Sequence, residues 1–176
     1  MADRVEVLVS GFGGQGVVRV GQILSTAAAG AGLHTTMLVS HGTETRGGYV
    51  RSQIVISDEL VDSPVVESAD FLCVLSQPAY DRFKCLARGP ILYDPAYVRP
   101  DESLATSQIG INARDLAMEQ VGREIFANVI MLGYLSKMME KTLSKDAVLA
   151  AMLERIPRLK EENTRAFDLG YSLAAQ

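Results

Sequence analysis

The residues with the clearest chemical potential form a glycine-rich run near the start of the chain. Its members are Gly11, Gly13, Gly14, Gln15 and Gly16. Three of the glycines have the spacing G-x-G-x-x-G, which allows a tight turn and lets backbone N–H groups approach an anion at the start of a helix. The run therefore predicts a phosphate-binding or other anion-binding loop. The alternative interpretation is that the glycines only let the first helix pack closely on a sheet.

A second polar cluster follows about thirty residues later. Its candidate binding residues are Thr43, Glu44, Arg46, Gly47 and Gly48. The guanidinium of Arg46 is a planar donor that suits a carboxylate or phosphate. The alternative is a solvated loop in which an arginine–glutamate pair contributes little to stability.

The elements that must position the glycine run are a strand and a helix. Residues 5–9 are almost all apolar and predict a buried strand, and an Ala-rich segment from about Gly14 to Gly32 predicts the helix. The next strand is expected over Thr35–Ser40. In a nicotinamide enzyme an acidic residue would end this strand and hold the ribose. The chain instead has Ser40-His41-Gly42, which counts against a dinucleotide.

The rest of the chain alternates strands with helices and then becomes helical. Strands are expected over residues 49–57, 69–75, 90–93 and 107–111, and a helix is expected to begin near Ser76. Three further helices are expected over Ile125–Met139, after Ser144 and from Pro157. Buried Asn163 is expected to have a satisfied amide. The pattern predicts one α/β domain over residues 1–176, a three-layer Rossmann-like fold with a mostly parallel sheet and a helical C-terminal third.

Composition excludes several classes of function. The 176 residues carry a net charge of −4 without a basic cluster, which argues against binding nucleic acid or a membrane surface. The N-terminus lacks the features of a signal peptide, so a cytoplasmic location is expected. Of two cysteines, Cys73 lies in an apolar strand and Cys85 has no histidine nearby. We therefore predict no catalytic residue, and no metal or iron–sulfur site built from this chain alone.

Taken together, the motifs resemble one family, the γ subunit of 2-oxoacid:ferredoxin (acceptor) oxidoreductases. The resemblance follows family order through almost the whole chain. Its motifs are Gly11-Phe-Gly-Gly-Gln-Gly-Val17, Gly42-Thr-Glu-Thr-Arg-Gly-Gly48, Ile54-Val-Ile-Ser-Asp58, Ser63-Pro-Val-Val66, Leu75-Ser-Gln77, Ala79-Tyr80, Asn128-Val-Ile-Met-Leu-Gly133 and Asn163-Thr-Arg-Ala-Phe-Asp-Leu-Gly-Tyr171. One departure is Ser40-His41-Gly42-Thr43, where the family more often has Ser-Tyr-Gly-Pro.

The resemblance implies a reaction and a set of partners. The complex would oxidatively decarboxylate a 2-oxoacid with coenzyme A, giving acyl-CoA, carbon dioxide and reduced ferredoxin. Thiamine diphosphate with magnesium, and the iron–sulfur clusters, would reside on the other subunits. This chain would be a required, non-catalytic subunit, inactive when isolated. Its two polar loops would face the subunit junction, where they dock partners or assist coenzyme A or substrate binding. The stretch Ser63–Val66 looks closest to the 2-oxoglutarate type.

Two rival hypotheses remain from the residues alone. One is a stand-alone nicotinamide or flavin oxidoreductase, which requires an acidic residue at the end of the second strand, whereas Glu44 lies inside the following loop. The other is a small homo-oligomeric module that binds an adenine-containing ligand such as coenzyme A or a nucleotide.

Overall fold

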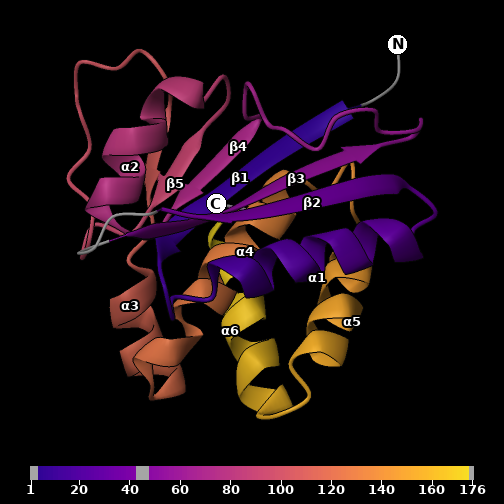
Figure 1. Ribbon diagram of the computed structural model, residues 1–176. Helices are drawn as coiled ribbons and strands as arrows, with labels where there is room; N and C mark the ends of the chain where they lie inside the picture. The colour runs from indigo at the N-terminus through magenta and orange to yellow at the C-terminus, as the bar shows by residue number, and fades with distance from the viewer. Residues whose placement is uncertain (1–3, 43–47, 175–176) are drawn as a thin grey trace.

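The computed structural model describes residues 4–42 and 48–174 (Figure 1). At its centre lies a six-stranded sheet with the strand order β2-β3-β1-β4-β5-β6. The strands are β1 (Arg4–Phe12), β2 (His34–His41), β3 (Tyr49–Ser57), β4 (Phe71–Val74), β5 (Ile91–Tyr93) and β6 (Gln108–Gly110). The α-helices are α1 (Val17–Gly30), α2 (Gln77–Phe83), α3 (Ala113–Leu116), α4 (Ala127–Met138), α5 (Lys145–Arg155) and α6 (Lys160–Leu173).

The sheet is mixed, with one strand reversed. β3 pairs antiparallel with both β1 and β2, whereas β1, β4, β5 and β6 pair in parallel. All strands except β3 therefore point the same way, as the mostly parallel prediction requires. The reversal arises because β2 returns directly into β3, and a direct return between neighbouring strands must be antiparallel. β3 thus separates β2 from β1.

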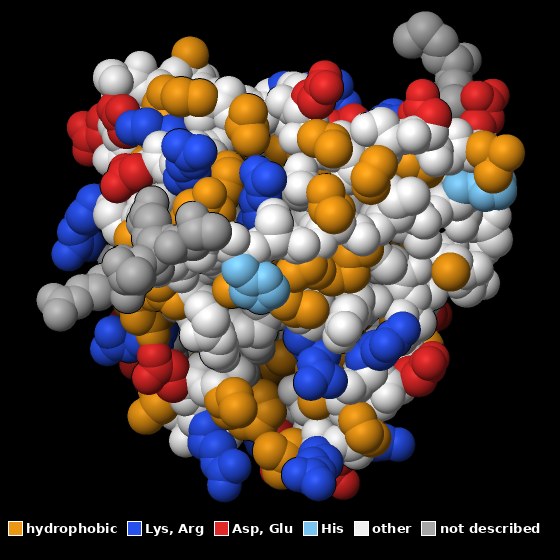
Figure 2. All heavy atoms as spheres, viewed as in Figure 1, with side chains coloured by type: hydrophobic (Ala, Val, Ile, Leu, Met, Phe, Trp, Pro, Cys, Tyr) orange, Lys and Arg blue, Asp and Glu red, His pale blue; other side chains and the backbone are white. Residues whose placement is uncertain are grey.

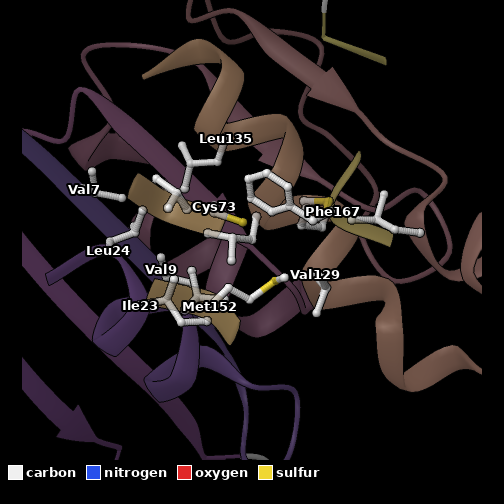
Figure 3. Packing of buried hydrophobic residues seen from close by; sticks show 14 of the residues in the cluster. Val7, Val9, Ile23, Leu24, Cys73, Val129, Leu135, Met152 and Phe167 are labelled. Carbon is white, nitrogen blue, oxygen red and sulfur yellow. The ribbon is translucent and has the colours of Figure 1, made fainter. Parts of the chain in front are cut away.

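Helices cover the two faces of the sheet unequally. α1, α4, α5 and α6 lie on one face, and α2 lies on the other (Figure 1). The larger core lies between the sheet and the four helices and includes Val7 and Val9 of β1, Leu24 of α1 and Phe167 of α6 (Figure 3). A smaller core on the opposite face includes Leu8. The α/β class and layered arrangement are confirmed.

Cys73 lies in the larger core and behaves as the sequence predicted. Its side chain is 2% exposed, and burial raises the pKa of the thiol to about 12. Because the thiol keeps its proton at neutral pH, Cys73 packs as a small hydrophobic residue.

Short local signals set the helix boundaries. Ser144 caps α5 by accepting a hydrogen bond from the N–H of Ala147, and a proline stands in the first turn of α2. The expected start of the last helix at Pro157 was wrong, since α6 begins at Lys160. Leu159 adopts a left-handed φ of 53°, which no helix can include. Buried Asn163 is satisfied, because its amide donates to two backbone carbonyls at 2.9 Å.

The helix expected over Ile125–Met139 is also divided at its start. A short 3₁₀ turn, Glu124–Phe126, precedes α4, and a π-helical turn, Ala117–Val121, extends α3.

No helix in the described ranges 4–42 and 48–174 has the length and apolar character needed to cross a bilayer.

The C-terminal helices approach one another at two reciprocal glycines. A methyl group on Gly133 of α4 would overlap the carbonyl oxygen of Phe167 in α6. A methyl group on Gly170 of α6 would likewise overlap the carbonyl oxygen of Ile130 in α4. The obstacle is backbone in both cases, so no side-chain rotation can relieve it. The two helices can pack at this distance only with glycine at both positions.

We therefore predict that Gly133→Ala lowers the free energy of unfolding by about 3 kcal/mol, because α4 and α6 must move apart and lose packing. Urea unfolding of the purified chain measures this change. Gly30→Ala is the matched control, since nothing lies within 4 Å of a methyl group there and its effect should stay within about 0.5 kcal/mol. Equal effects of the two variants would contradict the steric explanation.

Candidate functional site

The glycine run connects β1 to α1 in the predicted strand–turn–helix arrangement. Gly11 still belongs to β1, where it pairs with Val50, and α1 begins directly after Gly16. Gly14 and Gly16 have φ angles of 89° and 83°. Side chains at such angles are strained, so these two glycines are needed for the turn itself.

Gln15 closes the turn with both ends of its side-chain amide. Its Oε1 accepts a hydrogen bond from the N–H of Phe12 at 2.6 Å, and its Nε2 donates to the carbonyl of Leu75 at 2.8 Å. Leu75 directly follows β4, so this side chain ties the ends of β1 and β4 together. A Cβ atom on Gly11 would lie 2.5 Å from the Gln15 Oε1, which explains the glycine there. The predicted binding residue Gln15 is thus engaged within the chain.

Asn128, in the first turn of α4, packs against the glycine run. Its Nδ2 donates to the carbonyl of Gln15 at 3.3 Å, and a methyl group on Gly16 would overlap the same amide. The Asn128 Oδ1 is buried and has no hydrogen-bond partner among the described residues. Sequence reasoning did not predict this contact. The available signal was an amide at the start of an otherwise apolar helix.

Gly13 differs from the other members of the run. Its φ lies outside the left-handed region, and nothing lies within 4 Å of a Cβ built at this position. Neither the turn nor internal packing therefore requires a glycine here. A residue without a side chain at this exposed backbone leaves room for close approach of another molecule.

The run lies at a topological switch point of the sheet. From β1 the chain crosses to the β2 edge, whereas from β4 it continues toward β5 and β6. In open α/β sheets, ligands bind outside the carboxyl ends of the strands at such a point. Two cavities meet here, and Gly14 lines both of them.

The first cavity, of about 320 Å³, is acidic and apolar. Asp94 and Glu124 line it together with Ile125 and Met131. The Asp94 carboxylate accepts hydrogen bonds from two backbone N–H groups at 2.8 and 2.9 Å, and Tyr97 donates its hydroxyl to Glu124. Two carboxylates disfavour an anion, so this cavity suits apolar groups and hydrogen-bond donors.

The second cavity, of about 430 Å³, has the opposite electrostatic character. Arg19, Gln22 and His41 line it beside Gly13, and α1 starts there without a side-chain cap or an acidic residue in its first turn. Arg19 is anchored at this position, because its Nη1 donates to the carbonyl of Arg155 at 2.6 Å. An uncapped helix N-terminus beside a guanidinium favours a bound anion.

The residues that flank the second polar loop lie next to the glycine run. The N–H of Gly42 donates to the carbonyl of Tyr49 at 2.7 Å, and Tyr49 pairs with Phe12 at the end of β1. His41 and Gly48 therefore lie near the run. The remaining predicted binding residues of this loop fall outside the described residues: Thr43, Glu44, Arg46 and Gly47. Within the described ranges, no group of three or more His, Cys, Asp or Glu side chains could hold a metal ion.

The matches to known proteins extend along almost the full chain. The family model described as pyruvate ferredoxin/flavodoxin oxidoreductase matches residues 6–173. The chain is 37% identical to 2-oxoglutarate synthase subunit KorC of Methanocaldococcus jannaschii, over 98% of this chain and 95% of the relative.

Two solved structures share the fold. One is the gamma subunit of a keto/oxoacid ferredoxin oxidoreductase from Geobacter sulfurreducens, with 31% identity, a TM-score of 0.85, and coverage of 97% of this chain and 98% of that one. The other is a 2-oxoglutarate:ferredoxin oxidoreductase from Magnetococcus marinus with 2-oxoglutarate, coenzyme A and succinyl-CoA bound. It has 25% identity and a TM-score of 0.87, and the match covers 98% of this chain but 31% of that one.

The geometry of the run predicts unequal effects of two alanine substitutions. Gly16→Ala should lower the free energy of unfolding by about 2 kcal/mol, because its left-handed φ and the Asn128 contact both oppose a side chain. Gly13→Ala should change it by less than about 0.5 kcal/mol. Chemical denaturation of both variants measures the difference, and equal losses would show that Gly13 is also structural.

Tyr97 gives a prediction about pH. Burial, followed by the hydrogen bond to Glu124, raises the pKa of its phenol to about 12, whereas an exposed tyrosine ionises near pH 10. The pKa of Tyr97 is higher in the folded chain than in the unfolded chain. The contribution of the protonated phenol to the free energy of unfolding is therefore complete below about pH 10 and is lost as the pH rises through about 12. Ultraviolet titration of the wild-type chain minus that of Tyr97→Phe should isolate a transition near pH 12. A difference midpoint near pH 10 would contradict this.

Proposed function

Because the chain belongs to the pyruvate ferredoxin/flavodoxin oxidoreductase family, we propose that it is the γ subunit of a 2-oxoglutarate-type 2-oxoacid:ferredoxin oxidoreductase. The complex would convert the 2-oxoacid and coenzyme A to acyl-CoA and carbon dioxide while reducing ferredoxin. The observation that carries the proposal is the end-to-end likeness to a KorC subunit, over 98% of this chain. β2 also ends without the acidic residue that would hold the ribose of a dinucleotide. Both observations favour this function over a stand-alone nicotinamide or flavin oxidoreductase.

In this proposal the electron-transfer chemistry belongs to the partner subunits. Iron–sulfur clusters are held by sets of cysteine thiolates, and this chain has two cysteines. One of them, Cys73, is buried with its proton retained. We accordingly assign thiamine diphosphate, magnesium and the clusters to the other subunits, and to this chain a non-catalytic role within a cytoplasmic complex that delivers electrons to ferredoxin.

The glycine run and the 43–48 loop are proposed to face the subunit junction. Two features support contact with another molecule there: the open backbone of Gly13 and the side chain of Phe12, which is 37% exposed. The basic cavity beside them suits an anion, either a phosphate of coenzyme A or a carboxylate of a partner subunit. Coenzyme A would supply the thiol that accepts the acyl group. Arg19 and the first turn of α1 would bind and orient its charged end.

Reconstitution from separately purified subunits tests the proposal. The complex containing this chain should reduce ferredoxin with 2-oxoglutarate and coenzyme A, the complex without it should lose activity, and the isolated chain should be colourless and inactive. Ferredoxin reduction by the isolated chain would contradict the non-catalytic role, and full activity without it would contradict the requirement. Faster turnover of pyruvate than of 2-oxoglutarate would overturn the assigned substrate type.

A Gly13→Val variant in the same assay separates coenzyme A binding from docking. We expect about a tenfold loss of activity, equivalent to about 1.4 kcal/mol, because the new side chain blocks close approach to the run. A raised KM for coenzyme A in an intact complex would indicate ligand binding, whereas loss of co-elution with the partners would indicate docking. Gly30→Val, also in open space but at the far end of α1, is the control.

A further inference from the structure

One edge of the sheet is open along a complete strand. β2 pairs with β3 on one side and is the last strand of the sheet on the other. It has eight residues, and every one of them is at least partly exposed. Figure 1 shows β2 at the front of the molecule with α1 beneath it. An open edge of this length presents unpaired backbone groups to other chains.

The hydrogen-bond pattern identifies the backbone groups that point outward. Gly42 bonds to Tyr49 of β3, and in an antiparallel pair bonded positions alternate along the strand. Ser40, Leu38 and the other even-numbered residues of β2 therefore bond to β3. The residues directing their N–H and C=O groups away from the sheet are Thr35, Met37, Val39 and His41.

The edge lacks the features that usually prevent pairing. Within His34–His41 there is no proline and no Asp, Glu, Lys or Arg, the residues with which natural edge strands avoid association. The surface between the two histidines in Figure 2 is white and orange, without the blue or red of charged side chains.

The neighbouring face of α1 is uncharged as well. Arg19 and Thr26 bond to Arg155 and thus mark the side of α1 that faces α5. The residues about a quarter turn away from that side follow helical spacing and carry no charge: Val18, Gln22, Ser25 and Ala29. The uncharged surface therefore extends from β2 onto the adjacent side of α1.

We infer that β2 pairs antiparallel with β2 of a second copy of this chain, about a two-fold axis at Leu38. This register places Met37 opposite Val39 and Thr35 opposite His41, so every outward N–H and C=O finds a partner. Leu38 shares the face of Val55, away from α1, and would meet its own counterpart across the axis. Two chains that each carry a net charge of −4 repel one another least where neither is charged, which favours a second copy at this edge.

The area of the β2 edge determines how tightly the two copies are expected to bind. Eight residues extend about 27 Å, and the strand and helix layers together are about 20 Å deep. Each copy would then bury on the order of 500 Å², below the roughly 800 Å² per partner of a standard stable interface. We therefore expect a weak dimer with a dissociation constant on the order of 10 µM.

Sedimentation of the full chain between about 1 and 100 µM tests this inference. The wild-type chain should shift from monomer to dimer, and the outward amides of β2 should exchange hydrogen more slowly at high concentration. Leu38→Lys should remain monomeric, because two ammonium groups would meet at the axis. Leu60→Lys is the matched control, since Leu60 is 83% exposed in a loop outside the sheet.

A charge-pair experiment keeps the test independent of folding. Leu38→Lys and Leu38→Glu should each be monomeric, and an equimolar mixture should form a heterodimer through opposite charges at the axis. A wild-type chain that remains monomeric at the highest concentration would overturn the inference. So would a dimer unaffected by Leu38→Lys, a mixture that fails to associate, or a partner subunit's strand found on this edge in the assembled complex.

Discussion

The central strand β1 is the constraint on which the rest of the structure depends. It pairs with β3 on one side and with β4 on the other, and its side chains alternate between the two cores. Because it is enclosed laterally and on both faces, the chain can leave it only at the end of the sheet. That exit is the glycine run, which Gln15 fastens to the end of β4. The position of the candidate site is therefore a consequence of the position of β1.

The two cavities at this exit divide the surface by charge. Asp94 follows β5 and Glu124 begins the 3₁₀ turn before α4, whereas Arg19 and His41 come from α1 and β2. The run separates them, so one ligand or partner could place an anionic group on one side and an apolar or donor group on the other. Such a division orients a bound molecule more strongly than a uniformly charged surface would.

Sequence reasoning recovered the features that depend on local chemistry. Alternating and continuous apolar runs located the strands, and the helix cap at Ser144 was also correct. Contacts between distant segments were not accessible. Three features depend on residues far apart in the chain: the hydrogen bond from Asn128 to Gln15, the position of β3 between β1 and β2, and the hydrogen bond from Gln15 to Leu75. The start of α6 was missed because the left-handed Leu159 has no signature in residue type.

The order of the elements along the chain also affects how the protein is synthesised. The apolar face of β1 and α1 belongs to the beginning of the chain, but the helices that cover it, α4 and α6, belong to its end. The ribosome must therefore release the C-terminal third before that face can be buried. Until then the nascent chain exposes an apolar surface that is prone to aggregation. The α4–α6 pair is close in sequence, since only residues 139–159 with α5 lie between the two helices, so it can form quickly once it emerges.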